Sequence, residues 1–399
     1  MMDTRKKSIV CLSMTTWEGD YMKTIVHMMS QLAKDYKVLF VDYPFTYKDL
    51  AFSAFGKSTA PAGRMLGLKP RLRKLSVQGS VVNHLTLPPV LPTNWIGNFE
   101  MYRMVMASQS SIIAKSINNV LKELEMHNPI IINAFNPLIG VGLKGKLNEI
   151  ANIYYCYDEI RAAQWCGKHG GKMEDILIDQ SDAVVTTSTQ LQATKSQLNS
   201  HTHLIKNGVD FSLFNQAYNT SRLTKVIKVV GYLGSIDFRL DYDLLTRIIA
   251  SFPDYEFHFV GRISNEVGRS RLEKFDNVKF VGALQPNEIP GALSKFDIGL
   301  IPFVENEFTR NVYPLKINEY LAAGIPVVTT AFADLSDFSE MTTIVDKDDC
   351  FENAIRSELE NDSVKKMAKR AEMASTNDWS KRAEQMKELI EELTTSHAS

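Results

Sequence analysis

TRNVYPLKINEYLAAGIPVVTT, residues 309–330, predicts one helix followed by one buried strand. Pro314 suits the first position of a helix, and Leu315 and Tyr320 are spaced to face a core. Gly324 favours the end of that helix, and the apolar run after it is typical of a strand. A helix that leads into a buried strand is half of the unit from which parallel sheets are built.

The C-terminal half repeats this alternation at intervals of roughly 25–35 residues, the length of a βα unit in a doubly wound domain. Continuous apolar stretches predict the strands, and helical periodicity predicts the helices. The predicted strands are 226–234, 256–261, 277–282, 297–303 and 325–330, and the predicted helices are 242–252, 265–274, 289–296 and 315–324.

The N-terminal half shows the same pattern. Its predicted strands are 8–14, 37–41, 130–132, 153–156 and 183–187, and its predicted helices are 20–34, 100–126 and 172–180. We therefore expect an α/β protein with two Rossmann-like doubly wound domains, 1–205 and 206–376. A polar, turn-rich stretch near 205–225 joins them, and a last amphipathic helix is expected over 377–395.

The composition argues against several classes of protein. The 399 residues are 44% hydrophobic and 23% charged, as in globular proteins, which argues against a disordered or collagen-like chain. A formal net charge of −1 argues against a general binder of nucleic acids. The 4 cysteines form no C-x-x-C pair, which argues against zinc ribbons and disulfide scaffolds and fits a reducing cytosol.

No segment approaches the roughly 18 consecutive apolar residues of a membrane span. A basic N-terminus followed by apolar residues 9–14 leaves a signal peptide as one interpretation. The apolar run is short and no small-residue cleavage site follows it, so a buried first strand is favoured. We expect a cytoplasmic protein, with peripheral contact at the cytosolic face of the inner membrane as an open alternative.

Residues 56–76 interrupt the alternating pattern. They contain no acidic residue, but they contain six basic ones, Lys57, Arg64, Lys69, Arg71, Arg73 and Lys74, together with several leucines. One interpretation is a solvated surface loop. The other is a mobile basic and hydrophobic loop that contacts anionic lipid headgroups or a phosphorylated acceptor, through Arg64, Lys69, Arg71, Arg73 and Lys74.

Three loops follow predicted strands, at the sheet edge where doubly wound proteins bind ligands. Gly19 lies in the first loop, and Gly234 with Arg239 lies in the second. Lys316 and Glu319 lie in the first turns of the helix in 309–330, whose N-terminus favours an anion. Each feature also has a structural interpretation: a plain turn, a strand-end turn with a solvated arginine, and a glutamate that interacts with the helix dipole. No G-x-G-x-x-G or Walker motif is present.

The order of motifs in the second half resembles that of a known family. The motifs are NGVD at 207–210, GYLGS at 231–235, NVKFVG at 277–282, DIGLIPF at 297–303 and PLKINEYLAAGIPVV at 314–328. They resemble the retaining glycosyltransferases of the group 1 type, family four. In the first half only VVTTS at 184–188 and YYCYDEI at 154–160 fit. The resemblance implies a GT-B fold, in which two domains face a cleft and the last helix crosses back to the first domain.

The resemblance also implies roles for single residues. Glu319 corresponds to the family glutamate that binds the donor ribose, but Asn311 stands where the family has another glutamate, eight residues earlier. Ser235 stands where the family has an arginine, and Arg239 lies only roughly where it has a lysine. The family often has a histidine after the strand in 154–160, and Asp158 takes its place here as the expected donor-sugar contact.

The implied reaction is transfer of a sugar from a UDP or GDP sugar to an acceptor hydroxyl with retention of configuration, in the synthesis of a surface polysaccharide or glycolipid. Departure of the diphosphate requires positive groups. We expect them at the backbone of Gly234, at the helix start near Leu315, and at Arg239, Arg310 and Lys316. A diphosphate oxygen takes the acceptor proton, so no separate catalytic base is expected.

No cofactor and no metal are expected. The string Asp241-Tyr242-Asp243 matches the D-x-D pattern of metal-dependent transferases, but it directly precedes a predicted helix, where acidic residues serve as caps.

Two alternatives remain open. One is a GT-B sugar-nucleotide 2-epimerase, although the carboxylates and histidines that such chemistry needs do not stand out. The other is a non-catalytic scaffold of a polysaccharide assembly complex, which the amide at Asn311 keeps open.

Overall fold

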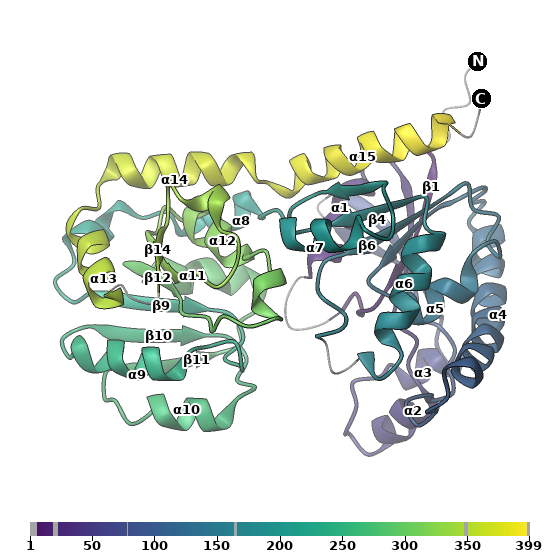
Figure 1. Ribbon diagram of the computed structural model, residues 1–399, viewed down its shortest axis with the longest axis horizontal. Coiled ribbons are helices and arrows are strands. Elements are labelled where there is room, and N and C mark those ends of the chain that lie inside the picture. Colours follow the sequence, from purple (N-terminus) through teal and green to yellow (C-terminus); the bar gives the residue numbers. More distant parts are fainter. Residues whose placement is uncertain (1–5, 19–22, 78, 163–165, 347–349, 397–399) are drawn as a thin grey trace. The chain divides into compact units, whose positions relative to one another are not determined.

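The computed structural model describes residues 6–18, 23–77, 79–162, 166–346 and 350–396, and it divides into two compact units (Figure 1). The first unit contains the described residues up to Lys206 together with those from Ala383 onward. The second unit contains Asn207–Arg382. Each unit is an α/β layer structure around its own sheet.

The described strands of the first unit form one sheet in the order β3-β4-β2-β1-β5-β6-β7-β8. The strands are β1 Ser8–Ser13, β2 Lys37–Val41, β3 Leu72–Val77, β4 Ser80–Leu85, β5 Ile130–Ala134, β6 Ala151–Cys156, β7 Ala183–Thr186 and β8 Thr202–Leu204. The helices are α1 Thr24–Leu32, α2 Tyr47–Ala54, α3 Ala62–Met65, α4 Phe99–Glu123, α5 Pro137–Leu143, α6 Gly170–Gln180 and α7 Thr189–Lys195. All pairings are parallel except that of β3 with β4.

The second unit contains a parallel sheet in the order β11-β10-β9-β12-β13-β14. Its strands are β9 Val229–Leu233, β10 Glu256–Val260, β11 Val278–Gly282, β12 Ile298–Ile301, β13 Val327–Thr330 and β14 Thr343–Val345. Its helices are α8 Phe211–Phe214, α9 Tyr242–Ser251, α10 Glu266–Leu272, α11 Ile289–Leu293, α12 Leu315–Ala322, α13 Phe351–Glu360 and α14 Val364–Thr376. The helix and the strand predicted in 309–330 are α12 and β13.

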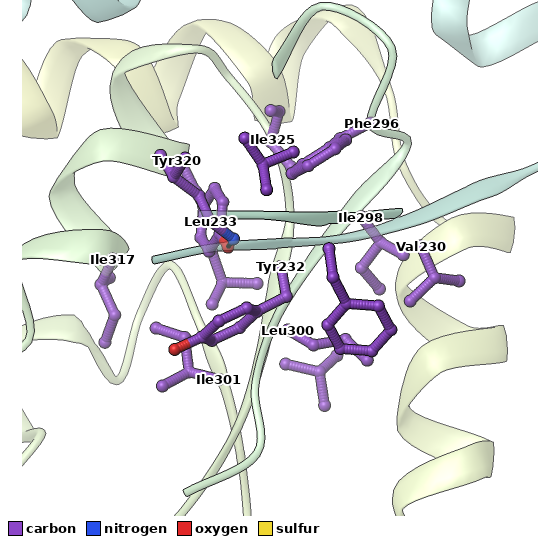
Figure 2. Close-up of a cluster of buried hydrophobic side chains, with 14 of the residues drawn as sticks. Val230, Tyr232, Leu233, Phe296, Ile298, Leu300, Ile301, Ile317, Tyr320 and Ile325 are labelled. Atoms are coloured by element: carbon purple, nitrogen blue, oxygen red, sulfur yellow. Dashed lines mark hydrogen bonds between the residues drawn. The ribbon is translucent and has the colours of Figure 1, made fainter. Parts of the chain in front are cut away.

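The core of the second unit fixes α12 against the sheet (Figure 2). Tyr320 of α12 is fully buried, and its hydroxyl accepts a 2.7 Å hydrogen bond from the backbone N–H of Leu233 at the end of β9. Gly231 allows close packing in the middle of β9, because a methyl group there would lie 2.0 Å from the ring of Phe296. The end of β9 and the first turns of α12 are therefore held in a fixed relation.

The last helix, α15 Trp379–Ser396, is shared between the two units. Its first turn pairs with the start of the second unit, where the backbone N–H of Trp379 donates to Val209 at 3.1 Å. From Ala383 onward the helix belongs to the first unit. There Lys387 forms an ion pair with Asp35.

Residues 56–76 are more regular than the predicted loop. Residues 62–65 form α3 and residues 72–77 form β3, so the interpretation of the whole segment as a loop is wrong. β3 was missed because an edge strand lacks the continuous apolar run of a buried strand: LRKLSV alternates half-buried and exposed side chains.

None of the helices in the described ranges has the length and apolar character needed to cross a membrane.

Candidate functional site

Gly234 lies directly after β9 and beside the first turn of α12. Its φ is +136°, and a methyl group there would lie 2.2 Å from Cε and 2.8 Å from Nζ of Lys316. The Gly234 N–H donates to the carbonyl of Val260 at 2.8 Å, which holds the loop against β10. Only glycine fits both the backbone angle and the approach of the lysine. The structure therefore brings together two residues that the sequence placed at one sheet edge.

Lys316 and Arg239 both lie close to aromatic side chains. Nζ of Lys316 lies 5.7 Å from the ring centre of Tyr232 and 5.4 Å from that of Phe303. Cζ of Arg239 lies 5.3 Å from the Phe303 ring centre. These separations are within the range of cation–π contacts. The aromatic rings therefore cover one side of two neighbouring cations and limit their hydration.

Lys316 and Glu319 both have shifted pKa values. Each side chain keeps part of its surface exposed, but each lies deep enough among protein atoms for burial to disfavour its charge. Burial lowers the pKa of Lys316, and Arg239 lowers it further, while Glu319 opposes the shift. Burial raises the pKa of Glu319, and Lys316 opposes that shift. A bound anion would stabilise the ammonium of Lys316 beside Arg239.

Arg239 forms an ion pair with Asp237, a carboxylate of the same loop. Its Nε and Nη2 atoms donate to Oδ1 and Oδ2 of Asp237 at 2.9 and 2.7 Å. This two-bond pair fixes the guanidinium plane over Phe303. Arg239 is therefore an oriented cation near Lys316 rather than a mobile one.

The N-terminus of α12 adds backbone donors to this site. Its N-cap residue is Pro314, and no side chain of the described residues caps it. The N–H groups of Leu315 and Lys316 lie in the first turn, where a helix carries a positive partial charge. Just beyond the other end of the helix, Arg222 and Arg370 both donate to the carbonyl of Gly324.

Arg310 and Asn311 lie in the loop before α12 and both have local partners. Arg310 forms an exposed 2.9 Å ion pair with Glu305. Asn311 is buried, and its Nδ2 atom donates to the carbonyl of Glu307 at 2.7 Å. A glutamate at 311 could not make this bond because a carboxylate only accepts. The Asn311 amide thus holds this loop by an internal hydrogen bond, a role that the sequence did not indicate.

Residues 227–361, which contain this whole cluster, match the profile of the family described as "Glycosyl transferases group 1". The chain carries a group 1 glycosyltransferase domain. A putative teichuronic acid biosynthesis glycosyltransferase, TuaH of Bacillus subtilis (strain 168), is 30% identical over 164 residues, which are 39% of this chain and 41% of that protein. The match therefore spans less than half of that curated relative.

Solved structures with the same fold cover nearly the whole chain. Sucrose-phosphate synthase from Thermosynechococcus elongatus matches with a TM-score of 0.71 at 16% identity, over 98% of this chain and 100% of the other. Anabaena HepE in complex with UDP and glucose matches with a TM-score of 0.63 at 14% identity, over 97% and 100%. These matches confirm the predicted GT-B fold of two parallel-sheet α/β domains.

Outside the group 1 domain, Asp158 lies just after β6 in the first unit. Its Oδ1 atom accepts from the N–H of Glu159 at 3.0 Å. Glu159 belongs to a buried ion cluster that the sequence did not indicate: Lys195 Nζ lies 3.1 Å from Glu159 and 2.8 Å from Glu174. Three charges so deeply buried fix the loop that carries Asp158. Its expected role as a sugar contact stays a prediction, and Gly19 lies outside the described residues.

The structure separates the basic residues of 56–76 into two groups. Arg64, Arg71 and Arg73 are engaged within the unit: Arg71 donates to the carbonyls of Arg64 and Met65 at 3.1 and 2.8 Å. Arg64 and Arg73 each lie 2.9 Å from the carboxylate of Glu18. Lys57, Lys69 and Lys74 are exposed.

The D-x-D string has structural partners. Asp241 is the N-cap of α9 and accepts from the N–H of Leu244 at 2.9 Å, while Asp243 forms an ion pair with Arg271. Within the described ranges, no group of three or more His, Cys, Asp or Glu side chains is placed to hold a metal ion.

Proposed function

We propose that this protein is a glycosyltransferase that moves a sugar from a nucleoside diphosphate sugar to an acceptor hydroxyl with retention of configuration. One observation carries the proposal. Inside a group 1 domain, the ammonium of Lys316 lies against Gly234 and beside the N-terminus of α12, with Glu319 one turn further along the helix. This arrangement offers cationic and backbone donors for a diphosphate, and a carboxylate for ribose hydroxyls.

In the proposed mechanism the diphosphate leaves first, and Lys316, Arg239 and the first N–H groups of α12 stabilise its growing charge. The acceptor hydroxyl then attacks from the same face and gives its proton to a diphosphate oxygen. Neither a metal nor a cofactor takes part in this proposal. Asp158 is the proposed contact to the donor sugar, and Arg310 the proposed additional cation of the loop before α12.

The proposed donor is a UDP sugar, with a GDP sugar as the second choice. HepE structures, which share this fold, contain UDP and UDP-glucose. The relative named for teichuronic acid biosynthesis supports a surface polysaccharide as the product. The acceptor is therefore proposed to be a growing saccharide of the cell envelope.

A ligand screen tests the donor site. We expect one of UDP-, GDP-, ADP- and dTDP-glucose to raise the unfolding midpoint measured by differential scanning fluorimetry. At 100 times its Kd it should stabilise the protein by about 2.7 kcal/mol. Glu319→Gln should reduce this shift, whereas Glu273→Gln, an exposed carboxylate paired with Arg269 in the same unit, should leave it unchanged.

The products formed by the same purified protein distinguish a transferase from an epimerase or a non-catalytic scaffold. NMR of the product formed with an acceptor should show the anomeric configuration of the donor retained. Formation of a C2 epimer from the donor alone would instead identify an epimerase. Donor binding with no product from any acceptor of the envelope class would support a scaffold.

We also propose a peripheral contact with an anionic membrane at the cytosolic face, where four free thiols suit a reducing compartment. The contact is the α2–α3 surface, which we define by four exposed apolar side chains on α2 and α3 or just after them, Phe52, Phe55, Leu66 and Leu68. Figure 1 labels the two helices. Leu68 is 79% exposed and Phe55 is 76% exposed.

The charges around this surface favour anionic lipid. Lys48, Lys57 and Lys69 are exposed on or beside these elements. Asp49 is the one acidic residue in 47–69, and its carboxylate accepts from the N–H and the hydroxyl of Thr46 in a capping box. Apolar side chains with lysines around them fit the boundary between acyl chains and anionic headgroups.

Vesicle binding tests this surface. We expect co-sedimentation with vesicles containing phosphatidylglycerol but not with pure phosphatidylcholine. Phe55→Ser with Leu68→Ser should weaken binding by at least about tenfold, because each buried side chain contributes roughly 1.5–3 kcal/mol. Val226→Ser with Ile227→Ser, exposed apolar residues of the second unit, is the matched control. Equal binding of both double variants would refute the surface.

A further inference from the structure

Two arginines of the first unit converge on one exposed carboxylate. Nη2 of Arg64 lies 2.9 Å from Oε2 of Glu18, and Nη2 of Arg73 lies 2.9 Å from Oε1. The Glu18 side chain is 56% exposed, whereas those of Arg64 and Arg73 are 18% and 27% exposed. The carboxylate is therefore more exposed to solvent than either of the two arginine side chains that it pairs with. Although burial alone would raise the pKa of Glu18, Arg73 and Arg64 lower it, so the carboxylate stays ionised.

A buried histidine, His84, contacts the guanidinium group of Arg73. Arg73 on β3 stands directly opposite His84 on β4, and its Nη2 atom lies 2.9 Å from Nδ1 of the ring. Arginine can only donate, so Nδ1 accepts and the ring proton belongs on Nε2. Nε2 lies 2.7 Å from Oδ2 of Asp42, and Oδ1 of Asp42 accepts from the N–H of Trp17 at 2.8 Å.

An exposed ion pair between Arg73 and Glu18 does not require a buried histidine and a buried aspartate next to it. His84 and Asp42 have side-chain exposures of only 0% and 4%. Burying two such groups is costly, while an exposed pair such as Glu18 with an arginine returns little stability. A chain of buried partners that fixes one guanidinium is typical of a pre-organised binding site, in which the supporting residues set the position of the group that contacts the ligand.

The geometry leaves part of each guanidinium unused. The two oxygens of Glu18 are divided between the arginines: Oε2 accepts from Nη2 of Arg64, and Oε1 lies 2.9 Å from Nη2 of Arg73. The Nε atoms of both Arg64 and Arg73 are buried without a hydrogen-bond partner in the described structure. Each guanidinium therefore keeps a donor that Glu18 does not use.

The position of the cluster fits a ligand site. Glu18 follows β1, Asp42 follows β2, and His84 lies near the end of β4. These three strands are parallel and neighbouring, so the cluster lies at the carboxyl edge of the sheet. Doubly wound units bind ligands at this edge.

We infer that Arg64 and Arg73 bind an oxyanion of a ligand, a carboxylate or a phosphate on a saccharide, and that Glu18 occupies this site as an internal competitor. Arg64 and Arg73 contact the oxyanion, while His84 and Asp42 are positioning residues. The identification of that ligand with the acceptor rests on the proposed function. The binding site itself does not, because it lies entirely within the first unit.

Removal of the competitor tests this inference. Binding of three probes, glucuronic acid, glucose 6-phosphate and neutral glucose, is measured by calorimetry without any donor. If Glu18 occupies the arginines about nine-tenths of the time, Glu18→Gln should tighten binding of an anionic probe about tenfold and leave glucose unchanged. Preference for glucuronic acid identifies a carboxylate ligand, and preference for the sugar phosphate identifies a phosphate ligand.

Further variants separate a binding role from a structural one. Arg73→Gln in the Glu18→Gln background should abolish the gain, and His84→Gln should reduce it, while Glu273→Gln should bind as the wild type does. Glu18→Ala, checked for folding by circular dichroism, repeats the test with the side chain removed. If neither Glu18 variant tightens anion binding, or if glucose tightens equally, the inference is wrong. Loss of transferase activity would not affect this result, because no donor is present.

Discussion

Replacing Lys316 with methionine is expected to lower kcat/KM for sugar transfer by about a hundredfold to a thousandfold, the usual effect of removing one pre-organised group that stabilises developing charge. Methionine keeps an apolar stem of similar length over Tyr232 and Phe303, so the fold should be retained. Initial rates with a radiolabelled donor and the unfolding midpoint of each variant are the two measurements.

The pH dependence of donor binding provides an internal check. Burial and Arg239 lower the pKa of Lys316, so its ammonium loses its proton at a lower pH than an ordinary lysine. A diphosphate binds the protonated form. Donor affinity of the wild type should therefore fall as the pH rises on the alkaline side of neutrality, and the slope should flatten in Lys316→Met.

Lys274→Met is the matched control, because Lys274 is an exposed lysine of the same unit. It should leave both the rate and the pH profile unchanged. A Lys316→Met protein with wild-type kcat/KM would remove Lys316 from the mechanism.

Asp362→Ala is expected to lower the free energy of unfolding by about 3–5 kcal/mol, the cost of leaving buried charges without their partner. Asp362 lies between Arg222 and Arg370, and the side chains of all three are 4% exposed or less. The same arginines donate to the carbonyl of Gly324 after α12. Loss of Asp362 therefore places two repelling cations at the C-terminal end of the helix that carries Lys316 and Glu319.

Urea unfolding monitored by circular dichroism measures this effect. Asp243→Ala is the control, since Asp243 is 90% exposed and its pair with Arg271 should contribute little. A loss below about 1 kcal/mol for Asp362→Ala would show that the two arginines find other partners or water.

The sequence predicted the elements that are apolar on both faces or strongly periodic. β9, β12 and α12 are of this kind, and their order indicated the fold. Gly234 and Lys316 could be placed at one sheet edge because both lie where a predicted strand or helix ends. β3 could not be predicted, because an edge strand with Arg73 and Lys74 carries no continuous apolar run.

Contacts between residues far apart in the chain could not be predicted from the sequence. Glu18, Arg73, His84 and Asp42 come from four segments, and the registers of β1 with β2, of β2 with β4 and of β3 with β4 bring them together. No local pattern marks such a cluster. The role of Asn311 was hidden for a similar reason, since a bond to a loop carbonyl depends on the backbone path rather than on residue type.

The division of α15 has a practical consequence for dissecting the molecule. Residues from Ala383 onward pack with the first unit, where Glu391 accepts from Lys7 and lies 3.3 Å from the hydroxyl of Tyr36. The first unit is not a single uninterrupted stretch of the sequence: a fragment ending at Lys206 lacks the terminal helix. A separately expressed first unit needs residues 383–396 attached through a linker. Truncation of the chain at its C-terminal end is expected to destabilise the first unit before the second.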